Sequence, residues 1–239
     1  MSSYTSGAEI KDMAKCNLER KYGVSILVLL TVAILENSAT LFLSQIIPAG
    51  TFAQFIIYSL CSFLLSAFLG IFKLGTCLFF LNMACGQPYK LDQLFYGFQY
   101  NASAAFTVSF AQGLLSLIST LPFRILLRLY VENRNIDYLC FSLIAFAVGF
   151  VIQYPISLAL SQSFYLLLDF PEYTGKQALA ASCKIMKKHM WRLFCLQLSF
   201  LPLMFICILT FSIGFLWLVP YMNMTYTLFF LDIMKSPAN

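Results

Sequence analysis

The sequence predicts an all-α protein: a polytopic transmembrane helical bundle with five to six spans and cytoplasmic-side amphipathic helices, in a single integral membrane domain over residues 1–239. Of the 239 residues, 60% are hydrophobic and only 10% are charged, and the mean hydropathy is +0.81. Soluble domains carry about a quarter charged residues. The apolar runs reach about 20 residues, the length that a helix needs to cross about 30 Å of hydrocarbon. They do not alternate as barrel strands do, so helices must satisfy the backbone polar groups.

The first 23 residues are expected to form an amphipathic segment at the membrane surface. They are too polar for a signal peptide, and no small-residue cleavage site follows the first apolar run. Apolar side chains recur among charged ones at helical spacing, which predicts a short helix lying on the membrane, the alternative being a solvated tail. The residues of this stripe are Ile10, Met13, Ala14 and Leu18.

Six apolar runs follow, and Pro or Gly residues bound most of them. Residues 48–50 close the first run, Pro122 closes the third, and Pro155 is expected to kink the fourth. The sixth run is short, so it is either a half-span or a continuation bent at Pro220. The expected spans are 24–47, 52–84, 102–121, 139–168, 193–218 and 220–234.

The distribution of Lys and Arg predicts which side of the membrane each loop faces. Basic residues gather before the first span and between the fourth and fifth, which places both segments and the N-terminus in the cytoplasm. The loop at 122–138 would then lie outside, although it contains three arginines. Arg124 and Arg128 are one helical turn apart among leucines and are expected to snorkel from an interfacial helix. The side of this loop stays open.

The best-defined polar element is a basic helix expected over 174–191. Thr174 and Gln177 fit a capping box at its start. One of its stripes consists of Ala178, Ser182, Ile185, Met186 and His189. Its cations are expected to attract anionic lipid headgroups or to hold the loop in the cytoplasm, and both roles can hold together. The candidate anionic-lipid contacts are Lys176, Lys184, Lys187, Lys188 and Arg192.

Two charged residues fall inside predicted spans, where charges are costly and usually paired or functional. Glu36 in the first span and Lys73 in the second lie at similar depth, about 16 to 18 Å from the cytoplasmic end by helical rise. We therefore predict an intramembrane Glu36–Lys73 pair. It is either part of a polar cavity or ion pathway, or a structural ion pair, or a neutral Glu36 beside Asn37 with Lys73 snorkelling.

No motif for catalysis, a cofactor or a metal is present. The sequence contains no G-x-S-x-G, P-loop or H-E-x-x-H motif, and its single His and eight Cys, without a C-x-x-C pair, do not suggest a metal site. We expect no enzyme activity, no cofactor and no catalytic, cofactor-binding or metal-binding residues. Small residues are expected instead to form the contacts between spans. They are Ser62, Ser66, Gly70, Ala105, Ser109, Gly113, Ala145 and Gly149.

The last third of the chain carries residues typical of a known family. They include Asp169, Pro171, Ser182, Trp191, Pro220 and Tyr221. Through them the chain resembles an uncharacterised family of bacterial polytopic membrane proteins, domain of unknown function 975. The resemblance covers most of the chain and is strongest from Phe164 onward, whereas the course of the chain around Pro122 departs from the family pattern. It implies a membrane fold in the bacterial inner (cytoplasmic) membrane and no particular activity.

Three functions are compatible with these features. The basic helix and the intramembrane polar groups favour a non-enzymatic protein that binds lipid or an amphipathic peptide, in envelope maintenance or self-protection. The polar groups also suit a small transporter or a transporter membrane subunit, and the small-residue faces suit a structural partner of another membrane protein. The expected partners are membrane lipids, with a second copy of the chain or another membrane protein, and not nucleic acid.

Overall fold

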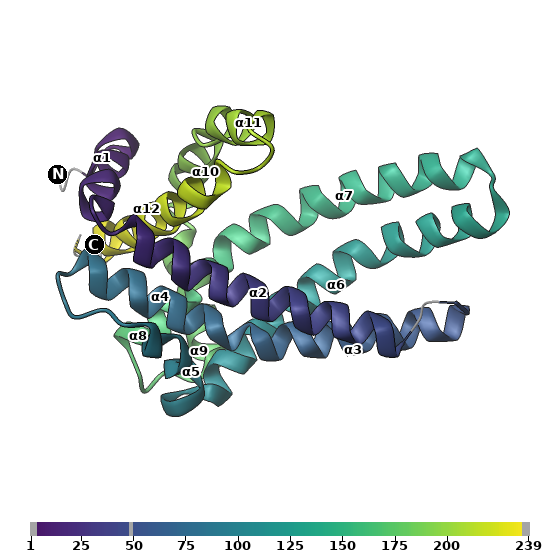
Figure 1. Cartoon of the computed structure of the whole chain (residues 1–239), viewed down its shortest axis with the longest axis horizontal. Coiled ribbons are helices and arrows are strands. Elements are labelled where there is room, and N and C mark those ends of the chain that lie inside the picture. The colour runs from purple at the N-terminus through teal and green to yellow at the C-terminus, as the bar shows by residue number, and fades with distance from the viewer. Residues whose placement is uncertain (1–3, 48–49, 236–239) are drawn as a thin grey trace.

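The structure, a computed structural model, describes residues 4–47 and 50–235, and every regular element within these ranges is a helix (Figure 1). Residues 48–49 of the predicted first turn lie outside the described residues. Five helical stretches are long and apolar enough to cross a membrane. They are Tyr22–Ile46, Phe52–Ala84, Ala102–Asn133, Ile136–Asp169 and Met190–Leu209. The predicted fold class, a polytopic transmembrane helical bundle, is confirmed.

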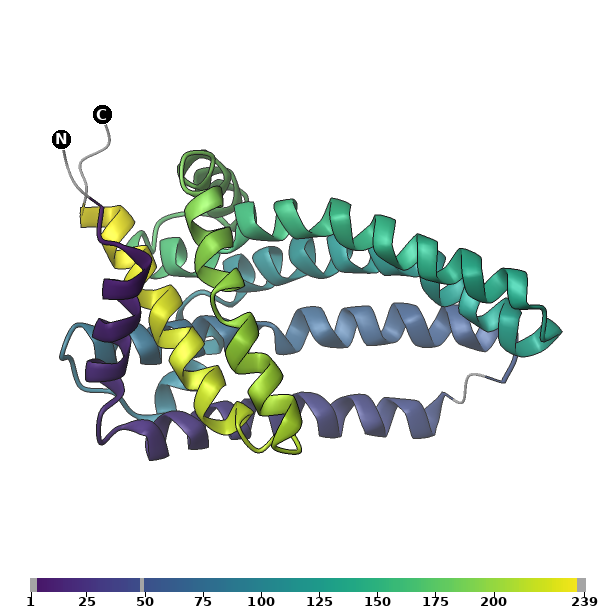
Figure 2. The same ribbon diagram turned by 90° about the horizontal axis from the view of Figure 1, so that it is seen from above.

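Two long hairpins form the body of the bundle. In the first, α2 (Tyr22–Ile46) precedes α3 (Phe52–Leu69), which continues beyond Gly70 as α4 (Ile71–Ala84). In the second, α6 (Ala102–Asn133) packs along α7 (Ile136–Leu160). The tips of both hairpins lie at one end of the molecule, the loop end, and both described chain ends lie at the other, the terminal end (Figures 1 and 2).

Short helices gather toward the terminal end (Figure 1). They are η1 (Leu91–Phe95), α5 (Tyr96–Tyr100), α8 (Ser163–Asp169) and α9 (Gly175–Met186). The helix of the predicted fourth span passes through Pro155 and first breaks at Ser161 and Gln162, where α7 gives way to α8.

α6 continues past Pro122, contrary to the boundary expected from the sequence. It is 32 residues long, which corresponds to about 48 Å of helical rise. Pro122 removes one backbone donor, and such a loss is tolerated in membrane helices that neighbouring helices support. Here the support is α7: a Cβ at Gly149 would lie only 2.3 Å from the Ser119 carbonyl oxygen. Residues 122–133 are therefore helix rather than loop.

The boundary between the last two apolar runs was also placed wrongly. α10 (Met190–Leu198) and α11 (Leu201–Leu209) lead into a turn, after which α12 (Phe215–Lys235) runs unbroken through Pro220. The turn is made by Phe211 and Ser212, whose φ angles are 51° and 67°. The predicted spans 193–218 and 220–234 are thus replaced by α10–α11 and a 21-residue α12.

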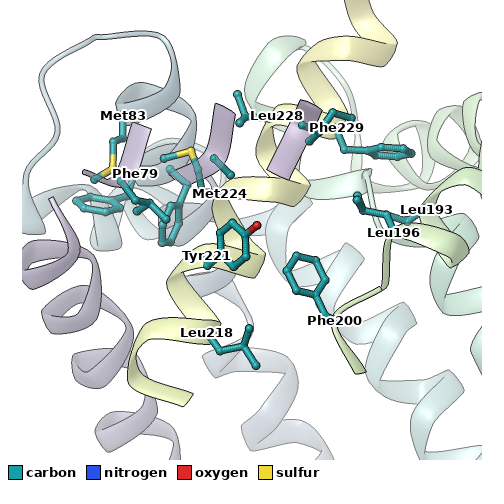
Figure 3. Packing of buried hydrophobic residues seen from close by; sticks show 14 of the residues in the cluster. Phe79, Met83, Leu193, Leu196, Phe200, Leu218, Tyr221, Met224, Leu228 and Phe229 are labelled. Atoms are coloured by element: carbon teal, nitrogen blue, oxygen red, sulfur yellow. The ribbon is translucent and has the colours of Figure 1, made fainter. Parts of the chain in front are cut away.

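α12 is the central packing helix of the terminal end. Figure 3 shows Met224 near Phe79 of α4, and Tyr221 near Phe200, which follows α10. Of these side chains Phe79, Phe200 and Met224 are 0% exposed, so this contact belongs to the fully buried core. Burying an aromatic or thioether side chain of this size, instead of leaving it exposed to water, stabilises a fold by about 1.5–3 kcal/mol.

The N-terminal helix packs on protein instead of lying with its apolar stripe on lipid. α1 (Gly7–Leu18) begins with a capping box between Ser6 and Glu9. Its residues Ile10, Ala14 and Leu18 are 0% exposed, because α1 packs against α12 and α10. The predicted stripe is confirmed except for Met13, which is exposed, and the expected membrane contact of the stripe is corrected.

The α11–α12 hairpin ends well short of the loop end along the long axis of the molecule (Figure 2). Its tip is apolar and unusually exposed: Leu209 is 81% and Phe211 is 93% exposed. Since an apolar tip without protein contacts requires lipid around it, the tip is expected to lie inside the bilayer.

We expect the two tryptophans of the chain to report this depth. In a Trp191→Phe variant, lipids brominated near the bilayer centre should quench Trp217, at the start of α12, more strongly than lipids brominated near the headgroup. In the matched Trp217→Phe variant, Trp191 at the start of α10 should show the opposite order. Equal depth profiles would contradict a hairpin that ends within the membrane.

Candidate ligand-binding cavity

A cavity of about 900 Å³ lies among the membrane-crossing helices. Its walls come mainly from α2, α3, α4, α6 and α7, while α8 contributes Phe164 and α12 contributes Val219 and Asn223. Apolar surface makes up most of the lining, but many side chains carry hydroxyl groups, among them Ser59, Ser62, Ser66, Thr76, Ser109 and Thr120. This volume is within the about 300–1,000 Å³ range of small-molecule sites, which are ordinarily lined by apolar groups. An amphipathic cavity, with charged and hydroxyl side chains inside a transmembrane bundle, is therefore the feature that a function must explain.

The spacing of the lining residues explains how the cavity arises. Ser59, Ser62 and Ser66 recur at three- and four-residue spacing, so they share one face of α3. On α6 the lining residues extend from Ser109 to Arg124, about 22 Å by helical rise. The hydrocarbon core is about 30 Å thick, so the polar wall follows most of the membrane thickness.

The lining hydroxyls face the cavity mainly as acceptors. Except for Ser116, each donates its proton to a carbonyl three or four residues earlier in the chain, for example Ser59 to Phe55 at 2.8 Å and Thr120 to Ser116 at 2.8 Å. Their lone pairs remain available. Gln112 donates its amide N–H to the Leu160 carbonyl at 3.2 Å, which leaves its amide oxygen to accept. The wall therefore favours a ligand that brings N–H or O–H donors.

Glu36 and Lys73 both line this cavity, together with Arg124. Ser25 Oγ on α2 lies 3.8 Å from Met83 Sδ on α4, which aligns the two helices near the terminal end. From that contact Glu36 and Lys73 are about 16 Å and about 15 Å further along their helices by helical rise. They thus share a cavity and a comparable depth, as the sequence suggested.

The two side chains do not touch. Among the described residues, neither the Glu36 carboxylate nor the Lys73 ammonium has a hydrogen bond or an ion pair within 4.0 Å. Lys73 is exposed to the cavity although its neighbours Phe72 and Leu74 are 7% and 1% exposed. The predicted direct pair is therefore replaced by two opposite charges that face one cavity.

Two of the three arginines assigned to an outside loop belong to α6, and the third, Arg134, is the residue that ends it. Arg124 lines the cavity. Arg128 ties the two hairpins together, because its guanidinium donates to the Gly50 carbonyl at 2.7 Å and to Glu132 Oε1 at 3.0 Å, and lies 5.4 Å from the Phe55 ring centre. Arg128 thus has protein partners instead of the headgroups expected for an interfacial helix.

Arg192 forms a latch at the terminal end with Thr5 and Asp232. Its guanidinium donates to the Thr5 carbonyl and to the Asp232 carboxylate. Thr5 in turn donates its backbone N–H to Asp232 at 3.3 Å. The guanidinium also lies 5.2 Å and 5.1 Å from the ring centres of Tyr4 and Phe229. Arg192, predicted as a lipid contact, therefore binds protein groups in this Thr5–Arg192–Asp232 latch instead.

The basic helix is shorter than the predicted 174–191, because α9 ends at Met186 and a turn precedes α10, which begins at Met190. α9 begins with the predicted capping box between Thr174 and Gln177. Ser182 is buried and donates to the Ala159 carbonyl at 2.7 Å, which docks α9 on the end of α7. Burial, followed by the charges of Arg192 and Lys188, lowers the pKa of His189 below its usual value. The remaining candidate lipid contacts are all exposed: Lys176, Lys184, Lys187 and Lys188.

A family model described as Protein of unknown function (DUF975) matches residues 1–237. The chain belongs to this family. It matches no curated protein and no solved structure at a significant level. The resemblance found in the last third of the sequence is confirmed, and membership of the DUF975 family assigns no activity.

The residues that carry the DUF975 resemblance lie outside the cavity lining. Ser182 docks α9, the Pro171 carbonyl accepts from the Asn101 amide at 3.4 Å, and Tyr221 packs edge-on to Phe200 at 5.3 Å between ring centres. Pro220 is buried in α12, whereas Asp169 and Trp191 are exposed. Those residues of the family pattern that make contacts, Pro171, Ser182 and Tyr221, therefore help to hold the terminal end together.

Sequence reasoning missed several members of the cavity and the latch. Arg124 was assigned to a loop, and Asn223 and Asp232 were not singled out. Ser62 and Ser66 of α3 were noticed only as a packing face and Ser59 was not singled out, although the recurrence of the three on one helix face was the available signal for a polar wall. Thr5 gave no signal, since its partners are distant in the sequence.

Proposed function

We propose that this protein is a non-enzymatic bacterial inner-membrane protein that binds an amphipathic ligand, a lipid or a peptide, in its intramembrane cavity. The binding would serve envelope maintenance or self-protection. The polar side chains in the otherwise apolar cavity carry the proposal, because polar groups that face hydrocarbon are costly unless a polar partner or water meets them. An amphipathic ligand provides such a partner and keeps its apolar part in lipid.

The proposed orientation places the terminal end in the cytoplasm. The basic residues before α2 and the exposed lysines of α9 belong to this end, where anionic headgroups would attract them at about 1 kcal/mol per cation. The positive-inside tendency supports the same side for the N-terminus. Exposed lysines on α9 also support membrane lipids as partners.

Native mass spectrometry of the full chain in mild detergent tests the binding proposal. We expect a discrete retained lipid or peptide mass, and a loss of most of that occupancy in Lys73→Ala, because the variant removes a cavity cation. The matched control is Lys90→Ala, whose side chain does not line the cavity. An unliganded spectrum, or one fixed protein partner, would overturn the proposal and favour a structural role.

A transporter or transporter subunit is the second candidate, and the length of the polar wall favours it. Proteoliposomes with a headgroup-labelled lipid distinguish the two, because dithionite reduces only label that reaches the outer leaflet. A binding protein leaves the inner-leaflet label protected, whereas a transporter exposes it.

A further inference from the structure

We propose that the cavity binds a zwitterion: a ligand with a primary ammonium group directed at Glu36 and a phosphate or carboxylate group directed at Lys73. The assignment rests on the proposed function, because it names the chemistry of the ligand in the same cavity. A phospholipid with an ethanolamine headgroup and a free amino zwitterion share this chemistry.

The first support is the pair of opposite charges without protein partners. Glu36 and Lys73 line one cavity, and no described residue pairs with either side chain. Charges at this depth need a partner of opposite sign. A simple anion would satisfy Lys73 and oppose Glu36, and a simple cation would do the reverse. A zwitterion satisfies both and adds no net charge.

The second support is the shortage of free hydroxyl donors in the wall near these charges. Thr40 donates to the Glu36 carbonyl at 2.8 Å, and Thr76, one turn from Lys73, donates to the Phe72 carbonyl at 3.0 Å. Both threonines also line the cavity and retain their lone pairs. A primary ammonium has three N–H donors for such a wall. A quaternary ammonium has none, so ethanolamine is favoured over choline.

The third support concerns which cation meets the anionic group. Gly70, one turn before Lys73, is so close to α6 that a Cβ there would lie 2.6 Å from Ser109 Oγ. Lys73 is therefore near Ser109, whereas Arg124 is about 22 Å further along α6 by helical rise. One small headgroup cannot bridge Glu36 and both cations. The similar depths of Glu36 and Lys73 select Lys73.

The test uses the full chain, delipidated in mild detergent and examined by native mass spectrometry. The probes are short-chain phosphatidylethanolamine, phosphatidylglycerol and phosphatidylcholine, and free phosphoethanolamine as a competitor. We expect retention of the ethanolamine lipid to exceed that of the other two lipids by about tenfold or more. Neither phosphatidylglycerol nor phosphatidylcholine has ammonium N–H groups, so both lose the charge-assisted hydrogen bonds to Glu36. Competition by free phosphoethanolamine would identify a soluble zwitterion as sufficient, and its absence would identify a lipid headgroup.

Charge variants sharpen the test. Glu36→Gln and Lys73→Gln are each expected to lower retention of the ethanolamine lipid about tenfold, whereas the controls Glu172→Gln and Lys90→Gln, outside the cavity, leave it unchanged. The double exchange Glu36→Lys with Lys73→Glu should recover part of the loss, because a zwitterion can bind in the reverse direction. Monodisperse gel filtration establishes that each variant is folded.

The outcomes separate the two proposals. Preferred retention of phosphatidylglycerol that depends on Lys73 and not on Glu36 overturns the zwitterion and leaves an amphipathic ligand in place. Unchanged retention in Glu36→Gln overturns the zwitterion as well. Retention of no probe, together with an unliganded spectrum of the protein from membranes, overturns both.

Discussion

Replacement of Arg192 by Ala is expected to lower the free energy of unfolding by about 2–4 kcal/mol. Removing one partner of a fully buried ion pair costs more, about 3–5 kcal/mol. The Arg192 and Asp232 side chains are 22% and 14% exposed, so solvent compensates only part of the loss. The variant leaves the Asp232 carboxylate with Thr5 alone. It also removes the cation that contacts the rings of Tyr4 and Phe229.

The latch joins segments that are far apart in the sequence, and this gives the variant a local signature. Without Arg192, the N-terminal segment that carries α1 should detach from α12 more often. Thermal unfolding in detergent should occur at lower temperature, and limited proteolysis should cleave the N-terminal segment faster. Lys187→Ala, an exposed cation on the nearby α9–α10 connection, is the matched control. Unchanged melting and cleavage in Arg192→Ala would show that the latch does not stabilise the terminal end.

The helices themselves were predictable because, in a membrane, the cost of leaving backbone polar groups without hydrogen bonds dominates. An apolar run of sufficient length must form a helix there, so five long stretches were recognised without any tertiary information. Their ends were less predictable. Pro122 is a strong helix breaker in water, yet α6 passes through it where Gly149 lets α7 approach. The turn at Phe211 was missed because no run of polar residues marks a turn that lies in an apolar environment.

The cavity was predictable only where charge made a residue conspicuous. Glu36 and Lys73 stand out in apolar runs, and helical rise places them at similar depth, but the space between them depends on how all the lining helices pack. Serines posed a different difficulty. A small hydroxyl residue suits both a close helix contact and a polar wall, and Ser66 and Ser109 illustrate both, since each lines the cavity and contacts a glycine position of a neighbouring helix. Asp232 could not be assigned to Arg192, because 40 positions separate them in the chain.

Gly149→Leu is expected to separate the loop-end halves of α6 and α7. A Cβ at this position would lie 2.3 Å from the Ser119 carbonyl oxygen and 3.3 Å from its carbonyl carbon, and backbone atoms cannot rotate away. Overpacking of this kind costs about 1–3 kcal/mol and occasionally more. We expect a cost near the upper end of this range, because α7 as a whole must move away from α6. The lining residues Ser116, Thr120 and Gln153 lie close to this contact along α6 and α7.

The loss should therefore appear both in stability and in ligand retention. We expect a lower melting temperature in detergent and weaker retention of the bound mass, since the α6–α7 wall of the cavity would open. Gly23→Leu is the matched control: a Cβ there meets nothing within 4 Å, so the same change should be neutral or stabilising by up to about 1 kcal/mol through helix propensity. Similar behaviour of the two variants would contradict a tight α6–α7 contact. Loss of stability with normal retention in Gly149→Leu would instead place the ligand toward the terminal end of the cavity, beside Lys73.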